Sequence, residues 1–118
     1  MYRAAGWWRP KDTPALLRRI VRGSRRFLVV FEGGRAVGMG RALGDGANDA
    51  YIQDVFVDEA LRGRGIGAQI VRRLVRRLKA DGAGWIGLIA AEGTRPFYEK
   101  LGFRRMKGCD PMLLQGSG

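Results

Sequence analysis

The sequence feature that most limits the possible folds is a glycine-rich hexapeptide, Arg62-Gly-Arg-Gly-Ile-Gly67, between a predicted strand and a predicted helix. Upstream, Tyr51–Val57 is rich in β-branched and aromatic residues. Downstream, apolar residues recur at helical spacing: Ile66, Ile70, Val71, Leu74, Val75 and Leu78. The first turn of such a helix has backbone N–H groups without helical partners, and the helix dipole favours an anion there. Because glycine lets a phosphate approach the backbone closely and two arginines add charge, the hexapeptide predicts a diphosphate site.

Two other phosphate-binding loops fit this sequence less well. A P-loop needs Gly-Lys followed by Ser or Thr at the helix start, and none is present. Residues 63–68 formally match the dinucleotide pattern G-x-G-x-x-A, with Glu92 near the place expected for a ribose ligand. However, charged residues 58–62 separate the strand from the glycines, and too few residues follow for several βαβ units. A helix start whose glycines and arginines bind nothing is the simplest alternative.

Two blocks of the sequence point to one family. Arg62-x-x-Gly65-x-Gly67 is similar to the pyrophosphate loop of the GNAT superfamily of N-acyltransferases, Gln/Arg-x-x-Gly-x-Gly/Ala. Phe97-Tyr-Glu-Lys-Leu-Gly-Phe103 resembles the late helix of that superfamily and the strand after it. One predicted helix and one predicted strand lie between the blocks, as that fold requires. The resemblance covers Phe27 to Met112.

The resemblance implies an acetyl-CoA or other acyl-CoA cosubstrate and no metal. It also implies that backbone amides of the hexapeptide surround the pyrophosphate. The residues expected to contact the cosubstrate are Val55, Phe56, Val57, Arg62, Gly63, Arg64, Gly65, Ile66, Gly67, Phe97 and Tyr98.

Composition excludes several other classes. A chain of 118 residues is expected to form one domain, 1–118, with residues 115–118 as a disordered tail. The sequence has neither an apolar run long enough to span a membrane nor the apolar core of a signal peptide. Its one cysteine, Cys109, fits a reducing cytoplasm. The absence of histidine removes Ser-His and Cys-His nucleophile pairs and most transition-metal sites.

The net charge of +11 is the feature that raises nucleic acid as a partner. Five cations fall on one predicted helix face, opposite its apolar stripe: Arg72, Arg73, Arg76, Arg77 and Lys79. Such a face is usually solvated, and it can also attract an anionic cosubstrate at long range. Since neither an RNA-binding aromatic signature nor a helix-turn-helix accompanies the charge, no nucleic-acid partner is expected.

The order of predicted elements gives an α/β (α+β) fold. A helix from Thr13 to about Val21 precedes two strands joined by the hairpin signal Glu32-Gly-Gly-Arg35. A third strand, the long helix and a buried fourth strand then form a strand–helix–strand unit, whose two strands should be parallel. The expected strands are Phe27–Phe31, Arg35–Leu43, Ala50–Val57, Trp85–Ala90, Phe103–Met106 and Pro111–Leu114, and the later helices are Gly65–Ala80 and Thr94–Leu101.

These elements predict a mixed, mostly antiparallel sheet around a central parallel unit. The resemblance implies that the two parallel strands separate at one end and admit the acyl chain. The chain departs from the family pattern in two ways. Too few residues precede Ala15–Ile20 for the usual first strand and first helix, so the first strand is expected to be missing. Ala91 stands where many relatives carry an asparagine that contacts pantetheine.

The expected chemistry is transfer of an acetyl group to a primary amine by direct attack. Tyr98 is expected to protonate the departing thiolate, because the family places a tyrosine there and a phenol is protonated at neutral pH. The alternative is a tyrosine that only packs against the turn at Gly102. Backbone N–H groups near Phe56 and Val57 would stabilise the oxyanion.

The general base is not determined by the sequence. Asp54 interrupts an apolar strand beside Gln53, and Glu92 follows the next strand. Either carboxylate could take a proton, and either could instead bind an arginine. Tyr51 is expected to shape the acceptor pocket rather than to titrate.

The sequence thus predicts a cytoplasmic N-acetyltransferase whose acceptor is a small-molecule or peptide amine. A non-catalytic acyl-CoA-binding module and, further behind, a nucleic-acid-binding domain are the alternatives. Trp7 and Trp8 are adjacent and cannot share one helix face. Together with the missing first strand, which leaves an open sheet edge, they predict a homodimer.

Overall fold

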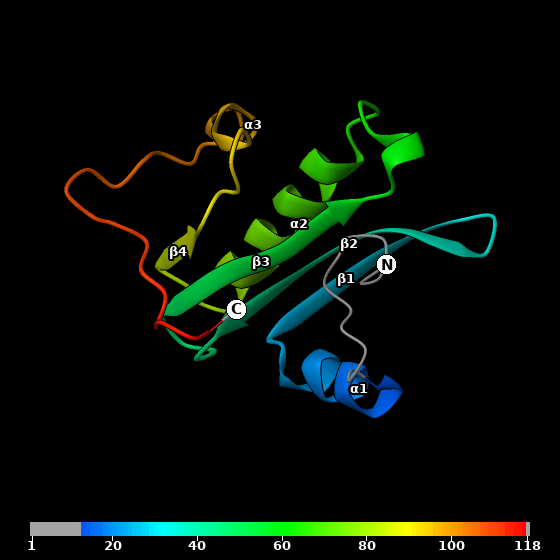
Figure 1. Cartoon of the computed structure of the whole chain (residues 1–118), viewed down its shortest axis with the longest axis horizontal. Coiled ribbons are helices and arrows are strands. Elements are labelled where there is room, and N and C mark those ends of the chain that lie inside the picture. Colours follow the sequence, from blue (N-terminus) through cyan, green and yellow to red (C-terminus); the bar gives the residue numbers. More distant parts are fainter. Residues whose placement is uncertain (1–12, 118) are drawn as a thin grey trace. The chain divides into compact units, whose positions relative to one another are not determined.

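The computed structural model describes residues 13–117. They fall into two compact units, divided after Leu88, which are described separately below. The expectations for Trp7, Trp8 and the missing first strand lie outside the described residues. The elements, in chain order, are α1 (Pro14–Gly23), β1 (Arg26–Glu32), β2 (Arg35–Gly44), β3 (Asp49–Val57), the 3₁₀ turn η1 (Glu59–Leu61), α2 (Ile66–Ala80), β4 (Trp85–Leu88) and α3 (Arg95–Glu99) (Figure 1).

The N-terminal unit contains one four-stranded sheet in the order β1-β2-β3-β4. β1 pairs with β2 and β2 with β3 in antiparallel fashion, while β3 and β4 are parallel and connected through α2. Gly33 and Gly34, both at positive φ (59° and 77°), form the β1–β2 turn as expected. The predicted antiparallel meander followed by a parallel unit is therefore confirmed.

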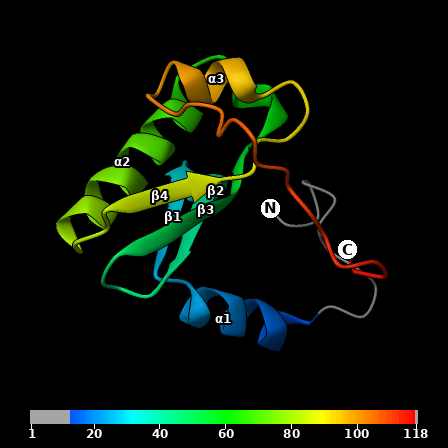
Figure 2. The ribbon, with the colours of Figure 1, turned by 90° about the vertical axis from the view of Figure 1, so that its left-hand side faces the viewer.

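The helix α2 covers one face of this sheet, as the strands and helix in Figure 2 show. Its predicted apolar stripe supplies four fully buried residues, Ile70, Val71, Leu74 and Leu78. The helix approaches β2 closely because the residues of β2 below it are glycines. A Cβ atom added to Gly40 would lie 2.6 Å from Cγ2 of Ile70 and 3.1 Å from Cδ1 of Leu74. The contact therefore depends on the missing side chain at position 40.

We expect Gly40→Ala to lower the free energy of unfolding by about 1–3 kcal/mol, since the methyl group overpacks a closed contact. Gly23→Ala is the matched control, because the added Cβ meets nothing within 4 Å and φ is not positive there. That variant should leave stability unchanged or raise it by up to about 1 kcal/mol. Chemical denaturation of both variants measures the difference, and equal stabilities would contradict the packing described.

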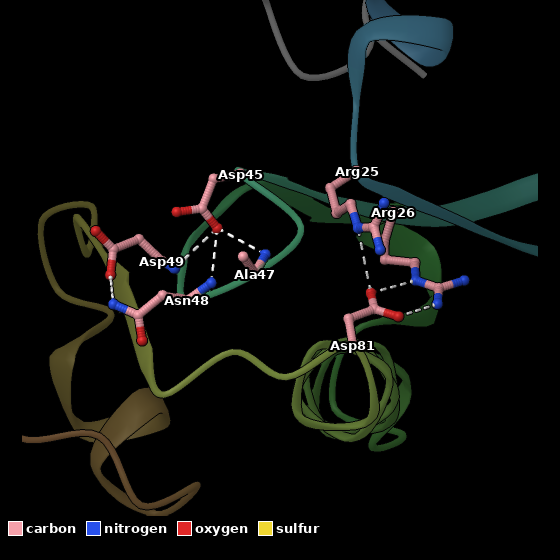
Figure 3. Close-up of polar contacts among 7 residues, drawn as sticks. All are labelled: Arg25, Arg26, Asp45, Ala47, Asn48, Asp49 and Asp81. Atoms are coloured by element: carbon pink, nitrogen blue, oxygen red, sulfur yellow. Dashed lines mark hydrogen bonds and ion pairs between the residues drawn. The ribbon is translucent and has the colours of Figure 1, made fainter.

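Two aspartates, Asp81 and Asp45, accept hydrogen bonds at the end of the sheet where β3 and β4 begin (Figure 3). Asp81, after α2, accepts hydrogen bonds from Nε and Nη2 of Arg26 at 3.0 and 2.5 Å, with Arg25 nearby at 3.4 Å. These contacts, led by the hydrogen bond from Arg26, lower the pKa of Asp81. Asp45 accepts three backbone N–H groups of its own loop, of which that of Asn48 is the largest cause of its lowered pKa.

The C-terminal unit contains α3 and a long irregular segment. Gly102 takes the left-handed conformation expected after the helix (φ 97°), and the ring of Phe103 lies 5.9 Å from that of Tyr98. The predicted strands 103–106 and 111–114 are wrong, because no strand is present between residues 103 and 117. A strand needs a partner for its backbone groups. Here local turns hold some of these groups instead, as in the bond from Ser117 N–H to the carbonyl of Leu114.

The fourth strand is also shorter and more exposed than expected. β4 ends at Leu88, not Ala90, and within it only Gly87 is buried. Trp85 is 36% exposed, and its indole lies where a side chain on Gly87 would be. The strand therefore presents an aromatic surface where the sequence predicted a buried core strand.

Candidate acyl-CoA site

The parallel strands β3 and β4 pair over only part of the length of β3. Their register runs from Asp49 with Trp85 to Ile52 with Leu88, while β3 continues for five more residues, to Val57. All four residues of β4 are paired, and β4 ends where this pairing ends, so the expected separation of the two strands stays a prediction. The three backbone-contact candidates Val55, Phe56 and Val57 all lie on this last part of β3 and are half-buried.

A β-bulge lies in β3 just beyond its last pair with β4. Gln53 pairs with Arg41 and Phe56 with Met39, so Asp54 and Val55 together oppose Gly40. Asp54 has φ 56°, and it is the one non-glycine residue with positive φ among residues 13–117. This conformation costs an L-residue about 1–2 kcal/mol, although aspartate tolerates it better than most. A bulge bends its strand and increases its twist, so β3 changes direction just beyond the last residue that it pairs with β4.

The carboxylate of Asp54 lies against an arginine. Oδ2 of Asp54 accepts a hydrogen bond from Nε of Arg41 at 2.5 Å, and both side chains are largely buried, 24% and 15% exposed. The alternative that Asp54 binds an arginine is therefore what the structure shows. Sequence reasoning did not find Arg41; its signal was an arginine in the middle of the otherwise apolar run 36–44 of β2, opposite Gln53.

The glycine-rich loop connects β3 to α2. It follows the turn η1, and Gly63 and Gly65 both take positive φ, 84° and 80°. Gly65 is the N-cap of α2, no side chain caps this helix end, and its first turn carries no acidic residue. Arg62, Gly63, Arg64 and Gly65 are exposed, while Ile66 and Gly67 are half-buried. The helix dipole at this end is thus not balanced by a carboxylate of its own first turn.

The two arginines of the loop differ in their contacts. Nε of Arg62 donates to the carbonyl of Val57 at 3.0 Å, and its guanidinium lies 5.5 Å from the ring centre of Phe56. Arg62 therefore folds back and holds the end of β3. Arg64 is exposed at the tip of the loop, where its charge adds to the field of the helix N-terminus.

The remaining candidates belong to the C-terminal unit. Tyr98 in α3 is half-buried between two rings, at 4.9 Å from Phe97 and 5.9 Å from Phe103. Burial raises the pKa of its phenol above the ordinary value. Glu92 is exposed, and it forms no ion pair with any other residue from 13 to 117. Phe97 is 37% exposed.

Tyr51 lies in the paired part of β3, not beside the bulge. Its ring is 4.9 Å from that of Trp85, at an interplanar angle of 59°, and it is 48% exposed. The two rings form an exposed aromatic pair on the start of the parallel strands. Tyr51 packs on the ring of Trp85, and its role in shaping the acceptor pocket stays a prediction.

Comparison with known proteins supports the same class. The acetyltransferase (GNAT) family matches residues 2–103. An acetyltransferase of the GNAT family from Streptococcus pneumoniae has a similar structure, with a TM-score of 0.81 at 25% identity, over 99% of this chain and 86% of the other. The chain belongs to the GNAT acetyltransferase family.

Among characterised relatives, serotonin N-acetyltransferase 2 (chloroplastic) of Oryza sativa is 37% identical over 83 residues, which are 70% of this chain and 40% of that protein. Glucosamine 6-phosphate N-acetyltransferase of Trypanosoma brucei is 39% identical over 72 residues, 61% of this chain and 41% of that protein. The chain spans about two fifths of the length of these relatives. No helix within residues 13–117 is long and apolar enough to cross a membrane.

Proposed function

We propose that this chain is an acetyl-CoA-dependent N-acetyltransferase that acts on a primary amine by direct attack. The observation that supports it best is the bulged end of β3, which runs beyond its last pair with β4 directly before an exposed glycine loop and an uncapped helix N-terminus. This end of β3 would receive the linear thioester arm. The loop amides, with Gly63 and Gly65 open to a bulky group, suit its pyrophosphate.

In this reaction the amine nitrogen attacks the thioester carbonyl carbon, and the carbonyl oxygen becomes negative. Backbone amides of Val55–Val57 stabilise that oxyanion. The C–S bond then breaks, and Tyr98 donates its proton to the thiolate, since burial keeps the phenol protonated beyond neutral pH. The proton lost by the amine passes to a base, directly or through water. No step needs a metal.

Glu92 is our preferred base, because the carboxylate of Asp54 is already bound by Arg41. We expect Glu92→Gln to lower kcat/KM roughly 10²-fold, the scale of losing a positioned base, and Asp54→Asn to lower it much less. The measurement is the steady-state rate of acetylation by both variants at one pH. A larger loss in Asp54→Asn than in Glu92→Gln would reverse the assignment.

On this proposal the acceptor is a small-molecule amine. The names of two relatives point to such acceptors for those proteins, serotonin for one and glucosamine 6-phosphate for the other. The exposed cations of α2, which include Arg72, Arg73 and Arg76, would help to attract anionic CoA. A cytoplasmic location and a homodimer complete the proposal.

A panel of amines tests the function, with release of the free CoA thiol as the readout. The panel should include serotonin, glucosamine 6-phosphate, a polyamine, an aminoglycoside, an arylamine and a peptide N-terminus. Acetylation of any member at a rate above hydrolysis supports the proposal. Binding of acetyl-CoA without acetylation of any amine would favour the non-catalytic module.

A further inference from the structure

The guanidinium of Arg41 joins three segments of the N-terminal unit. Nε donates to Oδ2 of Asp54 at 2.5 Å in β3, Nη1 donates to Oγ of Ser24 at 3.3 Å after α1, and Nη2 donates to Oε1 of Gln53 at 3.3 Å. Ser24 is itself fixed, because its hydroxyl donates to the carbonyl of Ile20 at 2.7 Å. The planar fork of an arginine can bind these groups together, whereas an ammonium group presents a single point charge.

Asp54 is the residue whose backbone takes the unusual conformation at the bulge. Without the bulge, position 54 would pair with Gly40, position 55 with Met39, and every later side chain of β3 would change face. With the bulge, Phe56 pairs with Met39, and the side chain of Val55 points towards α2, where its Cγ2 would lie 3.5 Å from a Cβ on Gly40. The bulge therefore determines the direction of the end of β3 and the face of the sheet on which each of its side chains lies.

We propose that Arg41 is a positioning residue, which holds Asp54 in the left-handed conformation and so fixes the bulge in the part of β3 that extends beyond β4. Asp54 then serves the site as the anchor of the bulge. The inference rests on the proposed function only in what it says about acetyl-CoA binding. Its structural part stands on the contacts of Arg41 alone.

A double-mutant cycle tests this role, because glycine takes positive φ without help. In the protein that keeps Asp54, Arg41→Met should weaken acetyl-CoA binding about tenfold or more. In the Asp54→Gly background, which keeps the bulge without a carboxylate, the same substitution should change the Kd less than about twofold. Arg41→Lys, which keeps the charge but not the fork, should fall between. Arg19→Met, on the exposed side of α1, is the matched control and should behave as wild type.

Hydrogen exchange of the amides at 53–57 is the second readout, and it needs no ligand. Arg41→Met should speed their exchange at least tenfold, with little change in the amides of β1. The KM for acetyl-CoA should rise in Arg41→Met with kcat less affected, because a displaced strand weakens binding first. This split distinguishes positioning from a general loss of folded protein.

The outcomes separate the inference from the proposed function. Equal weakening of binding by Arg41→Met in both backgrounds, or unchanged exchange at 53–57, would overturn the role of Arg41 while acetyl-CoA binding by the wild type stands. If the wild type binds no CoA, the proposed function fails, and the exchange experiment still decides whether Arg41 holds the bulge.

Discussion

Acetyl-CoA should raise the melting temperature of the wild-type protein by on the order of 10 °C at about 100 times its Kd, since it binds only the folded state. Gly65→Asp should abolish this shift, because it places a carboxylate at the N-terminus of α2, where the pyrophosphate is expected to lie. The fold should survive: an added Cβ meets nothing within 4 Å, and aspartate tolerates positive φ.

Gly65→Asn is the matched control for this experiment. Asparagine has nearly the same size as aspartate and tolerates the same left-handed backbone, but it brings no charge. A shift that is reduced in Gly65→Asn and absent in Gly65→Asp would identify electrostatic repulsion of a phosphate as the cause. NAD should give no shift. The absence of any shift with free CoA, acetyl-CoA and desulfo-CoA at millimolar concentration would refute the CoA site.

Tyr98→Phe should lower kcat roughly 10²-fold, the scale of losing a positioned acid, and leave acetyl-CoA affinity nearly unchanged. Because burial raises the pKa of Tyr98, wild-type turnover should persist to a higher pH than an ordinary phenol of pKa about 10 would allow. Steady-state kinetics from pH 7 to 11 measure both effects. Unchanged turnover in Tyr98→Phe would leave the residue with a packing role alone.

The same pKa shift predicts how stability depends on pH. A folded-state pKa above the unfolded value gives a contribution that is complete below about pH 10 and is lost as the pH rises through the folded value. Wild type should therefore lose stability relative to Tyr98→Phe on the alkaline side. Denaturation at pH 8 and above pH 10 compares them, and a constant difference would contradict the burial of the phenol.

Much of the N-terminal unit could be predicted because its signals are local. The helical spacing of Ile70, Val71 and Leu74 predicts the buried face of α2, and Gly33-Gly34 predicts the hairpin. The loop could be predicted because Gly63 and Gly65 take positive φ, a conformation that glycine adopts without help from distant residues. The parallel pairing then follows from the handed connection of strand, helix and strand.

The remaining features depend on contacts between distant residues. The bulge arises where two residues of β3 oppose Gly40, and its partner Arg41 lies 13 residues before Asp54. Residues 51–57 alone do not show at which position the regular pairing of β3 with β2 is interrupted. In the same way, Met112, Leu113 and Leu114 suggested a strand by composition, but they are 74–90% exposed, because a strand also requires a neighbour.

The brevity of β4 has a consequence for the order in which the sheet opens. β3 pairs with strands on both sides, whereas β4 has four residues and, within the described part of the chain, only β3 as a neighbour. Its contact with β3 also spans the whole of α2 in sequence, so it gains nothing from local closure. We therefore expect β4 to leave the sheet more readily than β3 does. On the proposed function, the thioester would lie between β3, which is held on both sides, and β4, which is held on one. Movement of β4 would then accommodate a longer acyl group.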